Sequence, residues 1–123
     1  NELQSAELMK SVCDPFLSEQ QIEKVYKWII ATQKHLPSND HDLNSLLDID
    51  LAILGSDAKR FADYEQQIRF EYTWVEADVY QVKRKQVLKQ FEQMNPIFQT
   101  NYFNQHLEKQ AKRNLADSMS ELI

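Results

Sequence analysis

Residues 47–55 read Leu-Asp-Ile-Asp-Leu-Ala-Ile-Leu-Gly, and this stretch decides the fold class. Its apolar residues continue a spacing of three and four positions that begins just upstream, which predicts an amphipathic helix over about residues 43–54. Gly55 follows where a helix C-terminus favours a left-handed residue. Asp50 interrupts the apolar face of this helix, which consists of Leu43, Leu46, Leu47, Ile53 and Leu54.

Helical spacing also extends outward from this stretch in both directions. Ser18 and Gln21 match a capping box, in which each side chain covers a free backbone N–H group at a helix start. Further N-caps are predicted at Asp42, Ser56, Asp78 and either Thr100 or Asn101. The five additional helices are predicted over about residues 3–13, 18–35, 56–74, 78–95 and 100–122. Because no segment alternates with period two, we expect an all-α fold of about six helices in a single domain over residues 1–123.

The composition excludes several classes of protein. One glycine and three prolines are too few for the turns of an all-β fold and leave no glycine-rich phosphate loop. Nineteen acidic against fourteen basic residues give a net charge of −5, which argues against general nucleic-acid binding. No apolar run approaches the roughly 18–20 residues of a membrane span, so we expect no membrane partner. The single cysteine, Cys13, fits a reducing compartment and predicts a cytoplasmic location.

Asp50 is the most informative acidic residue. A lone carboxylate on an apolar helix face costs several kcal/mol unless it is paired, hydrogen-bonded or bound to a metal. The residue pattern leaves two interpretations open: a structural pair with a cation or helix N-terminus, or a functional site. Asp48 lies about 200° around the helix from Asp50, so the two cannot chelate one ion from the same face.

The other candidate residues have simpler interpretations. His35 comes at the end of a predicted helix, where the macrodipole favours a histidine. His41 is expected in a polar turn, His106 on the solvated surface, and Cys13 as a small buried filler. The aromatic residues at helical spacing are expected mostly in the core; they are Phe61, Tyr64, Phe70, Tyr72 and Trp74.

The 47–55 stretch resembles the Leu-Asp-Ala-Asp-Leu-Ala-Ile-Leu-Gly signature of predicted metal-dependent phosphohydrolases in the HD-domain superfamily. Ile49 stands where that family usually has alanine, and Lys83 stands where it usually has glycine. The resemblance continues in the same order over nearly all of the chain, through residues 1–8, 29–35, 64–72, 80–88 and 97–115.

This resemblance implies a metal-dependent phosphohydrolase with an HD-type fold, of which this chain is the C-terminal portion. It implies that Asp50 is a ligand of a divalent Mn, Fe, Ni, Co or Zn ion and that Asp48 is structural. His35 would contact phosphate or a second metal, and Arg69 and Arg84 would clamp a phosphate. The alternative for each arginine is an ion pair, for example Arg69 with Glu65. The implied substrate is a small phosphorylated molecule or a nucleotide.

The remaining ligands, a histidine and a His-Asp pair, are expected upstream of Asn1, because the chain begins without methionine inside a helical pattern. We therefore expect this portion alone to hold no metal and to be inactive, and Asp50 to be buried, facing a groove with His35 nearby. The rival interpretations are a non-catalytic interaction module and an oligomerisation bundle that uses the last helix, Phe103–Leu122. The expected partners are a second copy or the segment that precedes Asn1.

Overall fold

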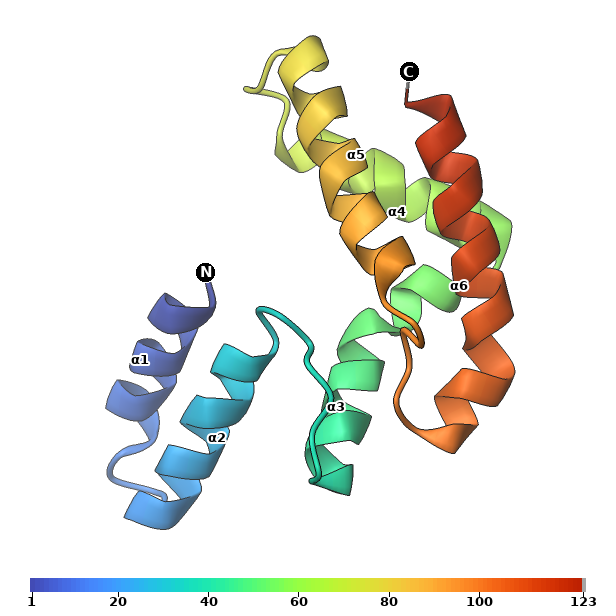
Figure 1. The fold of residues 1–123 in the computed structure, drawn as a ribbon. Coiled ribbons are helices and arrows are strands. Elements are labelled where there is room, and N and C mark those ends of the chain that lie inside the picture. Colours follow the sequence, from blue (N-terminus) through green and yellow to red (C-terminus); the bar gives the residue numbers. More distant parts are fainter. Residues whose placement is uncertain (123) are drawn as a thin grey trace. The chain divides into compact units, whose positions relative to one another are not determined.

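The computed structural model describes residues 1–122, which form six α-helices and one short 3-10 helix without strands (Figure 1). The predicted all-α class with about six helices is confirmed for this part of the chain. Within it, no helix has both the length and the apolar character that crossing a membrane requires. The elements are α1 (Glu2–Cys13), α2 (Glu19–Ala31), α3 (His41–Leu51), η1 (Ala52–Gly55), α4 (Ala58–Glu71), α5 (Ala77–Gln93) and α6 (Asn101–Glu121).

The chain divides into two compact units, one over residues 1–47 and one from Asp48 onward. Each unit is described by itself, and the expectation of a single domain over residues 1–123 stays a prediction. In the first unit, α1 and α2 lie side by side (Figure 1). Ala6 of α1 and Ile22 of α2 are the buried apolar residues of this pair.

The start of α2 follows the predicted capping box. The Ser18 hydroxyl accepts a hydrogen bond from the backbone N–H of Gln21 at 3.1 Å, and the Gln21 side chain accepts one from the N–H of Ser18 at 3.0 Å. These reciprocal bonds satisfy two of the amide groups that a helix N-terminus leaves without partners. The prediction of the capping box is therefore confirmed.

The end of α2 differs from the predicted helix. The helix stops at Ala31, and the chain turns before His35, whose φ of 55° is left-handed. The backbone N–H of His35 donates to the carbonyl of Ala31 at 3.0 Å, which closes the last turn. A left-handed residue just after a helix is a common C-terminal motif, but here it is a histidine instead of the usual glycine. The prediction that this helix runs to about His35 is therefore wrong, because α2 ends at Ala31 and His35 lies four residues beyond that end.

The second unit has one apolar core. Helix α6 packs against η1 and α5, and α4 contributes Phe61. Because α6 contacts the 3-10 turn directly, the core fixes the end of the 47–55 segment. The buried members of this core are Leu51, Leu54, Phe61, Leu88, Ile97, Phe98, Ala111 and Leu115.

Helix starts differ from the predicted ones by one or two residues. Helix α3 begins after Asp40, whose carboxylate accepts hydrogen bonds from the N–H groups of Asp42 and Leu43, so Asp42 is not the cap. Helix α5 begins after Glu76 and not at Asp78. Both predicted caps were wrong, because each helix begins earlier than the apolar pattern indicates.

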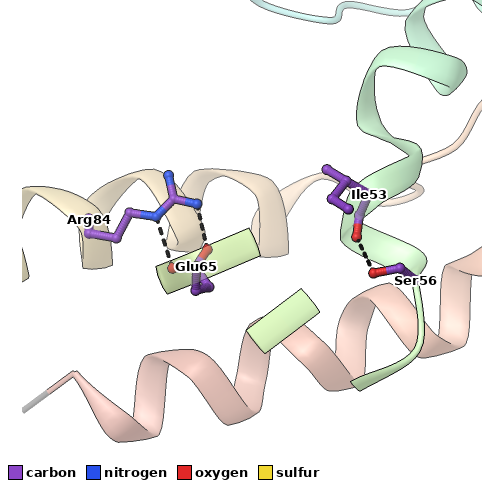
Figure 2. Close-up of polar contacts among 4 residues, drawn as sticks. All are labelled: Ile53, Ser56, Glu65 and Arg84. Atoms are coloured by element: carbon purple, nitrogen blue, oxygen red, sulfur yellow. Dashed lines mark hydrogen bonds and ion pairs between the residues drawn. The ribbon is translucent and has the colours of Figure 1, made fainter. Parts of the chain in front are cut away.

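The start of α4 also differs from the prediction. Asp57 is the N-cap and accepts a hydrogen bond from the N–H of Arg60 at 2.9 Å, so the predicted cap at Ser56 is wrong. The Ser56 hydroxyl instead donates to the carbonyl of Ile53 at 2.8 Å and closes the 3-10 turn (Figure 2).

Candidate functional site

Asp48 is the buried polar group of the 47–55 segment, with 1% of its surface exposed. Its carboxylate accepts hydrogen bonds from the N–H of Gln99 at 2.9 Å, the N–H of Thr100 at 2.8 Å and the Thr100 hydroxyl at 2.7 Å. Thr100 precedes α6, where the amide groups and the macrodipole favour a negative charge. Asp48 therefore holds the two residues that lead into α6 and ties the end of α3 to the start of α6.

A second carboxylate holds the preceding part of the same loop. Glu108 accepts hydrogen bonds from the N–H of Ile97 at 3.0 Å and from the N–H of Phe98 at 3.0 Å. Together, Asp48 and Glu108 bind four successive backbone N–H groups, over residues 97–100. Buried amides without such partners would be costly, so these two side chains define the conformation of the loop before α6.

Asn114 ties the other end of the segment to α6. Its side-chain amide donates to the carbonyl of Leu54 at 2.9 Å and to that of Ser56 at 2.7 Å, and its oxygen accepts from Gln110 at 2.8 Å. The side chain is buried with every hydrogen-bonding atom in use. The 47–55 segment is thus bound to α6 near both of its ends.

Gly55 is required by a close approach to α6. A Cβ atom at this position would lie 2.6 Å from the Cβ of Leu107 and 2.8 Å from its backbone oxygen. The backbone of Gly55 is not left-handed, so the expected reason for the glycine is wrong. The absence of a side chain, and not conformational freedom, allows η1 to reach α6.

Asp50 lies on the exposed side of α3, so the prediction that it is buried is wrong. The inward face of the last turn of α3 carries Asp48 and Leu51, and Asp50 is about 200° around the helix from Asp48. A carboxylate can occupy the inward face because the amides before α6 solvate its charge. The structural role predicted for Asp48 is supported by these hydrogen bonds. The role of Asp50 as a metal ligand stays a prediction.

Residues 1–122 do not form a complete metal site. No group of three or more histidine, cysteine, aspartate or glutamate side chains in this range is placed to hold a metal ion. Catalytic sites for ions such as zinc generally use three protein ligands. The described residues thus contain no complete ligand set for the metal that the resemblance implies.

The three histidines differ in exposure. His35 is 8% exposed, whereas His41, the first residue of α3, and His106 of α6 are exposed. The surface position expected for His106 is confirmed. His35 and Asp50 belong to different units, so the expectation that they are close, and the predicted contact of His35 with phosphate or metal, stay predictions.

Arg84 forms a nearly buried, bidentate ion pair with Glu65 (Figure 2). The N–O distances are 3.1 and 2.5 Å, and the side chains are 10% and 17% exposed. Burial by itself lowers the pKa of the Arg84 guanidinium, but the hydrogen bonds and charge of Glu65 outweigh it and raise that pKa. The guanidinium also lies 5.8 Å from the centre of the Tyr64 ring.

Arg69 stabilises the turn after α4. Its guanidinium donates to the carbonyl of Tyr72 at 2.9 Å and to that of Val75 at 3.2 Å, and it lies 4.5 Å from the centre of the Tyr80 ring. The expected pair of Arg69 with Glu65 is wrong, because Glu65 is the partner of Arg84. For both arginines the phosphate clamp stays a prediction.

We predict that Glu65→Gln lowers the free energy of unfolding of the second unit by about 2 kcal/mol, because it leaves the Arg84 guanidinium without its counter-ion. Urea unfolding followed by circular dichroism measures this loss. Replacing both residues by apolar ones, Glu65→Leu with Arg84→Met, should restore most of it. Glu23→Gln, which breaks the exposed pair with Lys27, is the control and should leave stability unchanged. Equal losses for Glu65→Gln and Glu23→Gln would contradict the prediction.

Comparison with known proteins adds no family to the all-α fold class. No family model matches the chain, and neither a curated protein nor a solved structure matches it.

Proposed function

We propose that this chain is part of a metal-dependent phosphohydrolase and that Asp50 supplies one carboxylate ligand to its metal. The observation that carries the proposal is the contrast between the two aspartates of the 47–55 segment. Asp48 is buried and bound to the loop before α6, whereas Asp50 lies on the exposed side of the same helix. A ligand must be reachable and held in place, and the anchors at Asp48 and Asn114 hold the segment that carries Asp50.

The substrate class that goes with this proposal is a small phosphoester or a nucleotide. The support is the resemblance of the ordered motifs to HD-type phosphohydrolases. Since residues 1–122 hold no group of three candidate ligands, the proposal requires further ligands to come from elsewhere in the parent protein, as the resemblance implies.

We expect Asp50→Ala in the parent protein to reduce metal-dependent phosphoester hydrolysis by at least about 100-fold while leaving the protein folded. The measurement is phosphate release from a panel of nucleotides and p-nitrophenyl phosphate, with and without Mn²⁺ or Co²⁺. Asp63→Ala, an exposed carboxylate on α4, is the matched control and should retain activity. Full activity of Asp50→Ala on every substrate that the parent protein hydrolyses would overturn the assignment.

The second candidate is a non-catalytic helical interaction module. It is favoured because both arginines of the predicted phosphate clamp already have partners within the protein. Arg84 pairs with Glu65, and Arg69 binds backbone carbonyls. A parent protein that hydrolyses no member of the panel with any divalent metal, although it is folded, would favour this candidate over the phosphohydrolase.

A further inference from the structure

An apolar groove lies between the end of α4, the turn that follows it and the first half of α5. Its volume is about 450 Å³, within the roughly 300–1,000 Å³ typical of sites for small organic molecules. The side chains expected in the core are here on the surface: Trp74 is 79% exposed and Tyr72 is 44% exposed. The apolar lining consists of Ile68, Tyr72, Trp74, Val75, Val79 and Val87.

The aromatic wall of this groove is held in place by its own contacts. The ring centres of Tyr72 and Trp74 are 6.0 Å apart, and those of Tyr72 and Tyr80 are 6.5 Å apart. Arg69 binds the backbone carbonyls on both sides of Trp74 and lies over the Tyr80 ring. The wall is therefore formed before any ligand arrives, which reduces the entropic cost of binding.

The groove carries one positive charge that the protein does not neutralise. Two cationic residues line it, Lys83 and Arg84, and no acidic residue does. The charge of Arg84 is matched by Glu65. Lys83 is exposed and makes no ion pair or hydrogen bond through its side chain among residues 1–122. Its aliphatic stem can lie along the apolar wall while the ammonium group stays at the rim.

We propose that this groove binds a small amphiphilic anion, a medium-chain carboxylate, with its apolar chain against Trp74 and Val79 and its head group on the Lys83 ammonium. The apolar lining provides affinity without directional contacts, and the single free cation selects for one negative charge on the ligand. This site does not include Asp50, the metal ligand of the proposed phosphohydrolase function.

Trp74 provides a direct measurement, because Trp28 is the only other tryptophan. In a Trp28→Phe background, decanoate is titrated below its micelle-forming concentration while Trp74 emission is recorded. We expect decanoate to shift the Trp74 emission in a saturable way. Decanol should bind at least about tenfold more weakly, since it cannot form the charge-assisted hydrogen bond with Lys83. Lys83→Met should lower the affinity for decanoate by a similar factor, and Lys83→Arg should retain the affinity. Lys85→Met, an exposed lysine of α5 outside the groove lining, is the matched control and should bind as the parent does.

Three outcomes would overturn the proposal. The first is equal binding of decanoate and decanol, and the second is unchanged decanoate binding by Lys83→Met. The third is a concentration-dependent shift of Trp74 emission without any response to decanoate, together with a dimer in sedimentation equilibrium, which would identify a second copy of the chain as the occupant.

Discussion

Asp48→Ala is expected to lower the free energy of unfolding of the second unit by about 3 kcal/mol, because it leaves three hydrogen-bond donors at the start of α6 unsatisfied. The substitution leaves the N–H of Gln99 and both the N–H and hydroxyl of Thr100 without an acceptor. It also removes the negative charge at the N-terminus of α6. Urea unfolding measures the loss, and amide hydrogen exchange at Gln99 and Thr100 should become faster, because these amides lose their hydrogen bonds.

Two further variants define the contribution of each bond. Asp48→Asn keeps one carbonyl oxygen as an acceptor, so its loss should be intermediate. Thr100→Val removes the hydroxyl donor and leaves the two backbone bonds, so its loss should be about 1 kcal/mol. Asp63→Ala, an exposed acid on α4, should leave stability nearly unchanged. A loss below about 1 kcal/mol for Asp48→Ala would contradict the role of Asp48 in holding the start of α6.

Gly55→Ala is expected to destabilise the second unit by about 2–3 kcal/mol, the upper part of the range for overpacking a well-packed site. The added methyl group would meet the Cβ, the Cα and the backbone oxygen of Leu107, which are parts of a helix and cannot move aside like the tip of a flexible side chain. Unfolding by heat or urea gives the size of the effect.

A comparison of Gly55 variants distinguishes close approach from backbone conformation. A left-handed position would tolerate Gly55→Asn better than Gly55→Ala, whereas a close approach penalises asparagine at least as much as alanine. Leu107→Gly removes the nearest atom, the Cβ of Leu107, so Gly55→Ala should cost less stability in a Leu107→Gly background than in the parent protein. A Gly55→Ala protein as stable as the parent would show that η1 does not need this close contact.

The aspartates of the 47–55 segment show where reasoning from sequence pattern reaches its limit. The spacing of leucines and isoleucines is compatible with two faces, one that includes Asp50 and one that includes Asp48 with Leu51 and Leu54. A carboxylate on either face costs free energy until a partner is found. The partner of Asp48 is the loop before α6, about fifty residues away in sequence. Because this contact is not part of any local sequence pattern, the pattern could not show which face of α3 is buried.

The aromatic residues near the end of α4 illustrate the same limit. Helical spacing placed Phe61 and Tyr64 in or against the core, which the structure confirms. The same reasoning failed for Phe70 and Trp74, which are exposed. Trp74 lies beyond the end of α4 at Glu71, in a turn held by Arg69, so helical periodicity no longer applies to it. Because α4 ends at Glu71, Tyr72 and Trp74 lie in the turn and form the exposed aromatic wall of the groove.

The sequence by itself determined the all-α class, the order of the helices and the capping box of α2, because helical periodicity and capping depend on residues a few positions apart. Tertiary structure decided which aspartate is buried, why residue 55 is glycine and which arginine pairs with Glu65. Each of these depends on a residue that is distant in sequence. Asp48 binds Thr100 in the loop before α6, Gly55 lies against Leu107 of α6, and Glu65 pairs with Arg84 of α5. The physical reason is that a buried charge or a close backbone contact is stable only when its partner is present, and packing alone brings those partners together.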